Sequence, residues 1–518
     1  MVGMDRRSFG KGMLGLGFGA LVAGSAVGCT SATGAAGSGA GGTAGSKTLS
    51  LALDMAYGSF DPAKQQSAFS LVLPWQACFD TLLRYEPDGT VSPNAAESYT
   101  FNDDKTELTL VIRSGMRFTD GTAVDAAAVK ASLEHMKNGG GSDAGRLADV
   151  TVTVKDASTV VLTTPKPKGL LPTFLCLAPG IISSPKSHTA KNRDTTPVGS
   201  GPYKLDAAAT TTGSTYTFVR NEDYWNKAAY AYDKIVMRQM TDITARVNAL
   251  KSGQINAAPI SSQTTTEVQS SGLTLLKNEV NWAGLFLGDP EGKVIPALKH
   301  VEVRRAINMV FDRQAILKAL FQGQGKVTNQ IFHNGSPAYL AGMVDHYAYD
   351  VAKAKKLMKK AGYADGFSFE LPAIPGLEFA TPLITQQLGL LGIKAKQAKI
   401  AANQVLPALF SGKYPIFFTF MESRTPLWDL VQTVAPEAVW NVTHTADARL
   451  QPLLDKAQVL DGAAAAENAQ AANEFLVEQA WFCPWVLPTN FYATDKTTSA
   501  RPYLGSVVPY LRSFKPAA

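Results

Sequence analysis

The sequence predicts a large α/β protein that contains more than one compact unit. The chain has 518 residues, of which 45% are hydrophobic, so enough apolar surface exists to fill real cores. Segments with the periodicity of strands alternate along the chain with segments of helical periodicity. The sequence shows neither a repeat of fixed period nor the series of long apolar runs that a multi-span membrane protein needs.

The individual elements follow from local patterns. Asp350 is typical of a helix N-cap, Leu357 and Met358 form the buried stripe of that helix, and Gly362 is typical of a C-cap. The same reasoning predicts strands over 47–53, 108–112, 150–154, 160–163, 367–371 and from 393 onward. It predicts helices over 124–136, 242–250, 303–310, 313–321, 350–361 and 383–391.

Residues 1–29 predict an export signal. Arg6 and Arg7, followed by Ser-Phe, resemble a twin-arginine signal, which exports proteins already folded; an ordinary secretory signal after a chance basic pair is the alternative. The apolar stretch that follows is diluted by glycines, which suits an export signal better than a spanning helix. Ala-Val-Gly before Cys29 resembles a lipobox, so Cys29 is the expected lipidation site.

Residues 30–46 predict a flexible tether, because every residue is Ala, Gly, Ser or Thr and cannot bury apolar area to offset its ordering entropy. A flexible chain of this length spans about 20–25 Å. We therefore expect an exported protein, anchored by lipid to the outer face of the cytoplasmic membrane, in the periplasm or at the cell surface. The remaining cysteines, Cys78, Cys176 and Cys483, allow at most one disulfide and are expected to be mostly buried thiols.

Composition and motifs argue against nucleic-acid binding and against catalysis. The net charge of +6 is too small for a chain of this length to indicate a nucleic-acid partner. Gly37-x-Gly39-x-x-Gly42 fits a dinucleotide fingerprint but lies inside the predicted tether, with neither a strand before it nor a helix after it. The six histidines are scattered, and Gly-x-Ser-x-Gly and Cys-x-x-Cys are absent from the sequence. We expect neither an enzyme nor a metal or cofactor.

A series of short sequence words resembles one family in order. These words occupy residues 59–63 (SFDPA), 79–85 (FDTLLRY), 92–98 (SPNAAES), 118–122 (FTDGT), 197–203 (PVGSGPY), 221–225 (NEDYW), 303–307 (VRRAI) and 350–363. Together they are similar to the extracytoplasmic solute-binding proteins of ABC transporters, in the oligopeptide/dipeptide/nickel-binding family (family 5).

The resemblance implies a two-lobed periplasmic-binding-protein fold, with an extra inserted subdomain and a hinge between the lobes. Lobe I would comprise 48–75, 198–280 and 485–518. The insert would comprise 76–197, and lobe II 281–484. A ligand would lie between the lobes, which close on it by hinge motion.

The resemblance also implies a ligand contact. Aligned on Pro426, Glu422 falls where peptide-binding relatives carry an aspartate that pairs with the peptide's α-ammonium, and Thr419 falls where they carry a tryptophan. Arg424 favours an anionic ligand such as a carboxylate. The alternative is that Glu422 and Arg424 simply neutralise each other.

Further candidates for the cleft are mainly aromatic. Trp282, Trp428, Trp440 and Asn441 lie in segments that line the cleft in relatives, and Phe60 is a weaker candidate. Exposed tryptophans suit a cleft because they supply large contact area, while the alternative is that each belongs to a core.

The predicted function is a monomeric, non-catalytic capture protein that closes its lobes on a small solute. The solute would be a short peptide or an amine-bearing compound, delivered to an ABC permease of integral membrane subunits driven by cytoplasmic ATPases. A sugar, an opine or a metal chelate as ligand remains open. Two other roles on the same scaffold also remain open, namely a surface sensor and an enzyme.

Overall fold

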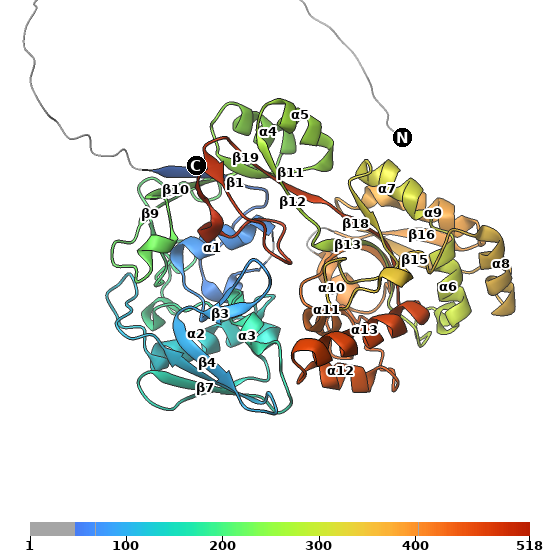
Figure 1. Cartoon of the computed structure of the whole chain (residues 1–518), viewed down its shortest axis with the longest axis horizontal. Helices are drawn as coiled ribbons and strands as arrows, with labels where there is room; N and C mark the ends of the chain where they lie inside the picture. Colours follow the sequence, from blue (N-terminus) through green and yellow to red (C-terminus); the bar gives the residue numbers. More distant parts are fainter. Residues whose placement is uncertain (1–46, 68, 402–403, 518) are drawn as a thin grey trace, which may run out of the picture. The chain divides into compact units, whose positions relative to one another are not determined.

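The computed structural model describes residues 47–67, 69–401 and 404–517 (Figure 1). The predicted export signal with Arg6 and Arg7, the lipidation residue Cys29 and the tether 30–46 lie outside the described residues. Within the described part of the chain, none of the helices has the length and apolar character needed to cross a membrane.

Lobe I is built around a mixed seven-stranded sheet in the order β12-β19-β11-β1-β10-β9-β8. Its central strand β1 pairs in parallel with β10 and β11, while the remaining neighbours are antiparallel. The strands are β1 (Thr48–Leu53), β8 (Tyr203–Leu205), β9 (Thr215–Arg220), β10 (Lys234–Gln239), β11 (Ala257–Ile260), β12 (Thr274–Asn278) and β19 (Asn490–Thr494). The associated helices are α1 (Val72–Cys78), α4 (Ile243–Lys251) and α5 (Thr265–Ser270), and β20 (Thr498–Ser499) pairs with β21 (Lys515–Pro516).

The inserted subdomain carries an antiparallel sheet in the order β4-β5-β7-β6. Its longest helix begins after Asp125, whose side chain accepts a hydrogen bond from Ala128 N, and ends at Gly139. The elements are β2 (Leu83–Tyr85), β3 (Val91–Pro93), β4 (Ala96–Phe101), β5 (Glu107–Ile112), α2 (Ala126–Asn138), β6 (Thr151–Val154), β7 (Thr159–Thr163) and α3 (Leu171–Phe174).

Lobe II contains the antiparallel sheet β14-β18-β13-β17 and a separate parallel pair, β15-β16. The strands are β13 (Asn281–Leu287), β14 (Gly325–Val327), β15 (Ser368–Ala373), β16 (Lys394–Lys399), β17 (Ile416–Glu422) and β18 (Phe482–Pro488). The helices are α6 (Val301–Met309), α7 (Arg313–Phe321), α8 (Val351–Lys360), α9 (Thr381–Gly389), α10 (Val405–Phe410), α11 (Pro426–Thr433), α12 (Gln451–Ala457) and α13 (Gly462–Glu478).

The chain passes between the two lobes at two places. β12 leads directly into β13 through residues 279–280, and β18 leads back into β19 through Thr489. The two crossings are neighbours, because the Asn490 side-chain amide donates to Asn278 O at 3.4 Å. β18 continues to Pro488, so the return to lobe I falls later than the predicted boundary at 484. Two short crossings of this kind are the usual construction of a hinge.

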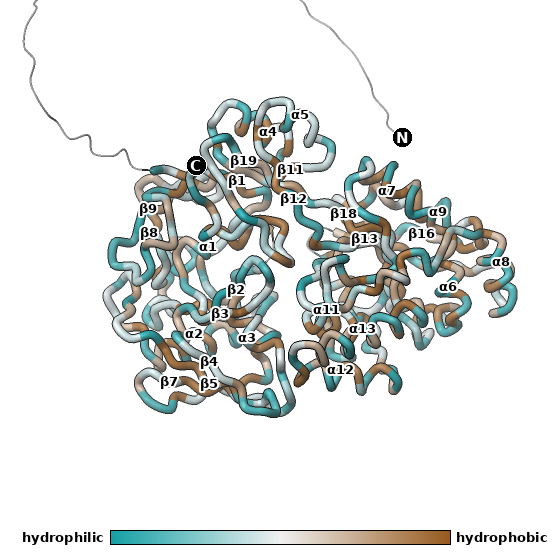
Figure 2. The backbone as a smooth tube through the Cα atoms, viewed as in Figure 1, coloured by the Kyte–Doolittle hydropathy of each residue, from teal (hydrophilic) through white to brown (hydrophobic). Residues whose placement is uncertain are grey.

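Each lobe has its own hydrophobic core (Figure 2). Lobe I has a core that extends from the large sheet into the insert and a smaller one around α4. Lobe II has one core around β13, α6 and α9 and one around α11 and α13. A small cluster joins Phe174 of the insert to Trp428 of lobe II. Cys78, Cys176 and Cys483 are buried within these cores as free thiols.

A buried ionic cluster joins lobe I to the insert. Asp61, which is 3% exposed, accepts from His135 Nε2 at 2.7 Å and from Arg193 Nε at 2.8 Å. The ring of His135 stacks on His188 with centroids 4.3 Å apart, and His188 Nε2 lies 2.8 Å from Ser183 Oγ. Burial would raise the pKa of Asp61, but the hydrogen bonds from His135 and Arg193 bring it below its usual value. We call Asp61, His135, His188 and Arg193 the Asp61 cluster.

Candidate functional site

A groove of about 860 Å³ lies between residues of both lobes. From lobe I and the insert it is lined by the turn at residues 87–90 and by Tyr503 and Leu504; from lobe II it is lined by Arg424, Leu427 and residues of α13. Its walls are mainly apolar, and Arg424 is one of its few charged side chains. A groove of this size and composition suits a small organic solute.

Arg424 lies in the contact between the lobes and is 2% exposed. A β-carbon at Gly505, in the last segment of lobe I, would lie 2.1 Å from Arg424 Cγ. Only glycine fits there, and the positive φ of +64° favours glycine as well. The aliphatic part of an arginine from lobe II is therefore clamped by the backbone of lobe I.

Glu422 and Arg424 form an ion pair, with Arg424 Nη2 2.8 Å from Glu422 Oε1. Desolvation raises the pKa of Glu422, in opposition to the attraction of Arg424 and Arg146. Burial disfavours the charge on Arg424, but Glu422 and neighbouring tyrosines raise its pKa above the usual value. Glu422 keeps 32% of its side chain exposed, so it can still reach a ligand. The ion pair between Glu422 and Arg424, which the sequence offered as the alternative to a ligand contact, is present, and it leaves part of the Glu422 carboxylate accessible.

Arg146 approaches the same place from the insert, where it lies in the short helical turn Ala144–Leu147. Its Nε is 3.1 Å from Asp143 Oδ1. The guanidinium groups of Arg146 and Arg424 lie 4.6 Å and 5.0 Å from the centroid of the Trp428 ring. Burial lowers the pKa of Arg146, and the charge of Arg424 lowers it further. Two cations, one from the insert and one from lobe II, are thus held against one indole.

Several donors in this cluster have no hydrogen-bond partner among the described residues. They are Arg424 Nε, Arg424 Nη1 and Arg146 Nη1. The acceptor Asn281 Oδ1, on the strand position paired with Glu422, is also without a partner there. Unpaired buried polar atoms are rare and costly, so they require an explanation. We call Glu422, Arg424, Arg146, Asp143 and Trp428 the arginine cluster.

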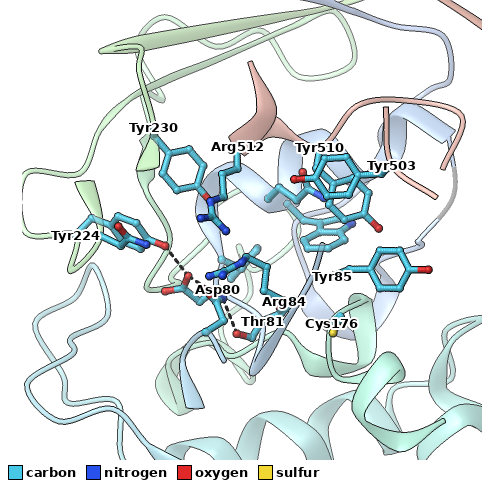
Figure 3. A pocket seen from close by; sticks show the side chains of 15 residues that line it. Asp80, Thr81, Arg84, Tyr85, Cys176, Tyr224, Tyr230, Tyr503, Tyr510 and Arg512 are labelled. Atoms are coloured by element: carbon cyan, nitrogen blue, oxygen red, sulfur yellow. Dashed lines mark hydrogen bonds between the residues drawn. The ribbon is translucent and has the colours of Figure 1, made fainter. Parts of the chain in front are cut away.

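An aromatic pocket of about 50 Å³ adjoins the arginine cluster (Figure 3). Tyr503 lines both this pocket and the groove, and the ring of Tyr85 lies 5.4 Å from the Arg424 guanidinium. Asp80 lies at the base of the pocket and accepts from Tyr224 Oη at 2.9 Å. Burial raises the pKa of Asp80 to about 6, against four hydrogen bonds that favour its charged form. The pocket has room for a small polar group.

Two predicted cleft residues belong to cores instead. Trp282 is 1% exposed and stacks on Phe286 at 5.4 Å, because its side of β13 faces the core of lobe II. Phe60 is 3% exposed and packs edge-on against Tyr57 at 5.0 Å. The expectation that these rings are exposed in a cleft is wrong.

The other three predicted residues differ in their placement. Asn441 is 4% exposed, and its side-chain amide donates to three backbone carbonyls, so it is fully engaged in its own loop. Trp440 is half-buried against Phe410, with ring centroids 5.1 Å apart. Trp428 is 4% exposed, so it is not an exposed tryptophan, but Phe174 of the insert covers it at 5.9 Å. Only Trp428, Glu422 and Arg424 of the predicted set therefore come together.

The sequence reasoning missed Arg146, Tyr85 and Asn281. The sequence held a usable signal for Asn281. Side chains on a strand alternate between its two faces, so Asn281 lies on the opposite face from Trp282. In the structure Asn281 is the residue paired with Glu422. Arg146 follows a glycine-rich loop and carries no pattern that separates it from a surface arginine. Among the described residues, no group of three or more His, Cys, Asp or Glu side chains is arranged to hold a metal ion.

Two lobes, two short crossings and a groove between them define a binding protein that holds a solute between its lobes. The chain belongs to the bacterial extracellular solute-binding proteins of family 5, whose middle region matches residues 90–427. It is therefore an extracytoplasmic solute-binding protein of an ABC importer, which confirms the fold and the general function expected from the sequence.

Individual relatives bind different solutes. The glutathione-binding protein GsiB of Salmonella paratyphi A (strain ATCC 9150 / SARB42) is 29% identical over 371 residues, which cover 69% of this chain and 70% of the relative. The structure of AgaA from A. tumefaciens R10 in complex with agropinic acid has a TM-score of 0.78 and 26% identity, and covers 91% of this chain and 99% of that one. DppA of Helicobacter pylori in complex with the peptide STSA has a TM-score of 0.76 and 21% identity, with 91% and 98% covered.

Proposed function

We propose that this protein is a lipid-anchored monomer that captures a small amine-bearing solute, such as a short peptide or an amino-acid conjugate, by closing its lobes. The observation that carries the proposal is the groove with walls from both lobes, where the lining residue Arg424 is paired with a partly exposed Glu422. A ligand stabilises the closed state only if it contacts both lobes, and a solute in this groove meets that condition. The closed form would then deliver the solute to the permease.

Two acceptors near Arg424, a residue that lines the groove, agree with an amine. Glu422 offers a carboxylate oxygen to an ammonium group, and Asn281 Oδ1 is an acceptor without a partner among the described residues. The relatives bind glutathione, agropinic acid and a peptide, as their names and titles state. Glutathione is a short amine-bearing peptide, so the relative that is 29% identical supports this class of solute here.

A ligand screen tests the proposal. Thermal unfolding is recorded with dipeptides, glutathione, opines, sugars and nickel chelates, because a ligand of the native state raises the melting temperature by mass action. Small-angle scattering on each hit measures closure. The proposal predicts a hit among the amine-bearing compounds, together with a smaller radius of gyration. Hits confined to sugars would contradict it.

The role of Glu422 and the anchor are tested separately. Glu422→Gln should weaken binding of an amine-bearing hit, and unchanged affinity would remove the role assigned to Glu422.

Cys29→Ser should release the protein from membranes into the soluble fraction. Continued retention in the membrane fraction would contradict the lipid anchor.

A further inference from the structure

The outer side of α8 is made almost entirely of lysine. All five of its lysines are exposed: Lys353, Lys355, Lys356, Lys359 and Lys360. The other side of the helix carries Ala354 and Met358, which are buried in the core of lobe II. With about 100° between successive residues, the five lysines occupy the side of the helix that points away from these two side chains. α8 is therefore an amphipathic helix whose apolar side is in the core and whose basic side is open to solvent. We call these five residues the lysine face.

The charges of the lysine face repel one another. Lys355 lies one helical turn before Lys359, and like charges at this spacing destabilise a helix. Lys356 and Lys360 repeat the spacing. Among the described residues, Lys360 is the one member with an ion-pair partner, Glu302 of α6 at 3.1 Å. The protein therefore leaves most of this charge uncompensated, and a negatively charged surface would relieve the repulsion.

The surrounding segment adds to the charge. Residues 350–399, from the N-cap of α8 to the end of β16, contain eight lysines and four acidic residues. Their net charge is +4, while the whole chain of 518 residues carries +6. On β16, Lys394, Lys396 and Lys399 are exposed as well. Figure 1 shows α8 at the outer end of lobe II, so positive charge is concentrated at one end of the lobe.

The dimensions and position of the lysine face select an anionic membrane as its partner. The ten residues of α8 span about 15 Å, so the ammonium groups are too widely spread for one small anion to reach them all. A bilayer with anionic phospholipids presents phosphates over such distances, and each lysine beside it strengthens binding about fivefold. The proposed lipid anchor and the predicted tether at residues 30–46 hold the protein within about 20–25 Å of such a surface.

We infer that the lysine face of α8 binds the anionic phospholipid headgroups of the membrane to which the protein is anchored. The inference goes beyond solute capture and rests on the proposed function only for the position of the protein beside a membrane. The anchor leads into lobe I at β1, whereas α8 belongs to lobe II. The contact thus gives the protein a second attachment, which orients it, and a lipid chain combined with a polybasic surface binds a membrane more firmly than either alone.

Vesicle binding by matched variants tests the lysine face. All proteins are made as the processed chain that begins at position 29, with Cys29→Ser, so that neither the export signal nor an attached lipid masks the contact. The α8 variant keeps the pair of Lys360 with Glu302 and combines Lys353→Gln, Lys355→Gln, Lys356→Gln and Lys359→Gln. The control variant changes the net charge equally at four exposed lysines of the insert, by Lys155→Gln, Lys166→Gln, Lys186→Gln and Lys191→Gln. Sedimentation with vesicles measures the affinity of each protein.

The protein with its native lysines should bind vesicles that contain phosphatidylglycerol and should bind vesicles of pure phosphatidylcholine far more weakly. The α8 variant should lose affinity for the anionic vesicles on the order of 10- to 100-fold, because not all four lysines contact a flat surface at once. The control variant should stay within about twofold of the native affinity. High salt should weaken binding of the native protein, because it screens the attraction.

A charge-preserving variant separates charge from folding. Arginine at the same four positions of α8, by Lys353→Arg, Lys355→Arg, Lys356→Arg and Lys359→Arg, should keep the native affinity for anionic vesicles. Gln and Arg are both good helix formers and the four positions are exposed, so neither α8 variant should lower the melting temperature. Loss of vesicle binding in the arginine variant would show that the charge is not the cause and would overturn the inference.

The remaining outcomes separate the lysine face from solute capture. Equal affinity of the α8 variant and the native protein for anionic vesicles overturns the inference, and so does an equal loss in the control variant. Binding of polyglutamate through α8 without binding of vesicles would assign the face to an acidic protein and overturn the membrane contact. Among the described residues that line the groove, none belongs to α8, so the effect of a captured solute on the melting temperature should be the same in the α8 variant. A solute screen without hits would overturn the proposed capture and leave the vesicle result standing.

Discussion

The molecule buries two clusters of charged side chains that differ in how completely they are satisfied. In the Asp61 cluster, both carboxylate oxygens of Asp61 accept hydrogen bonds from side chains. In the arginine cluster, three guanidinium donors have no partner among the described residues. The first cluster joins a lobe to its own insert, and the second lies where opposite lobes meet. Complete pairing therefore indicates a structural role, and incomplete pairing at the contact between lobes indicates a place for a ligand.

Removing the central acid of the satisfied cluster should have the largest effect on stability. Asp61→Ala leaves Arg193 and the stacked histidines without their carboxylate, and we expect a loss of about 3 kcal/mol in the free energy of unfolding. Urea denaturation measures this loss. Asp223→Ala, an acid in an exposed pair with Lys204, is the control and should change stability by no more than about 0.5 kcal/mol. Similar losses for the two variants would show that the Asp61 cluster is not structural.

The next largest effect should come from Gly505→Ala. The new methyl group would lie 2.1 Å from Arg424 Cγ, and we expect a cost of about 1–3 kcal/mol from overpacking. Because Arg424 belongs to the opposite lobe, the affinity for a ligand should fall as well. Calorimetric titration with the best hit of the screen measures the affinity.

Gly213→Ala provides the matched control for Gly505→Ala. Gly213 has a positive φ of +78° and no heavy atom within 4 Å of its would-be β-carbon. It should therefore show only the backbone cost of about 1–2 kcal/mol and an unchanged affinity. An affinity loss of equal size in both variants would mean that Gly505 acts through general destabilisation rather than through Arg424.

A smaller effect should appear in the pH dependence of stability. Burial lowers the pKa of His188 from 6.5 to about 4, and the neighbouring His135 adds to this shift. Between these two values the unfolded chain binds a proton that the native state does not, so stability should fall as the pH drops from about 6.5 to 4. In His188→Gln the melting temperature should fall less steeply over this window. Identical slopes in the two proteins would show that His188 does not contribute.

The smallest effect should come from a contact at the edge of the groove, which Asp461 lines. Lys105 of the insert pairs with Asp461 of lobe II at 2.6 Å, although Asp461 is 79% exposed. Lys105→Met should weaken ligand binding only about two- to fivefold, because partly exposed ion pairs contribute less than about 1 kcal/mol. Lys251→Met removes a pair with Glu267 within lobe I and should leave the affinity unchanged. A larger loss in Lys251→Met than in Lys105→Met would contradict the assignment.

The regular elements could be predicted well because their causes are local. The helix Arg313–Phe321 has its predicted bounds, and Asp350 caps α8 by accepting from Lys353 N, as its position in the sequence indicates. The strands at 48–53 and 107–112 also lie where alternation of side chains places them. These patterns depend on neighbours a few residues apart, so the sequence shows them directly.

The site could be predicted only in part because it is assembled from distant residues. Glu422 and Arg424 were found through a resemblance and are close in the sequence. Arg146 reaches them from another lobe, and no local pattern records that contact. The tryptophans show the converse: a large amphipathic ring suits both a cleft and a core, and only the packing of β13 decides that Trp282 is in a core.

The position of β19 has a consequence for biosynthesis. β19 lies between β11 and β12 in the large sheet, although it is made last of the three. Until the ribosome has released residues 490–494, β11 and β12 lack β19, the strand that lies between them. Their unpaired backbone N–H and C=O groups can then form hydrogen bonds with other strands or other chains. A twin-arginine route, as predicted from Arg6 and Arg7, would let this late strand insert in the cytoplasm before translocation. It would spare the chain from completing its sheet on the far side of the membrane.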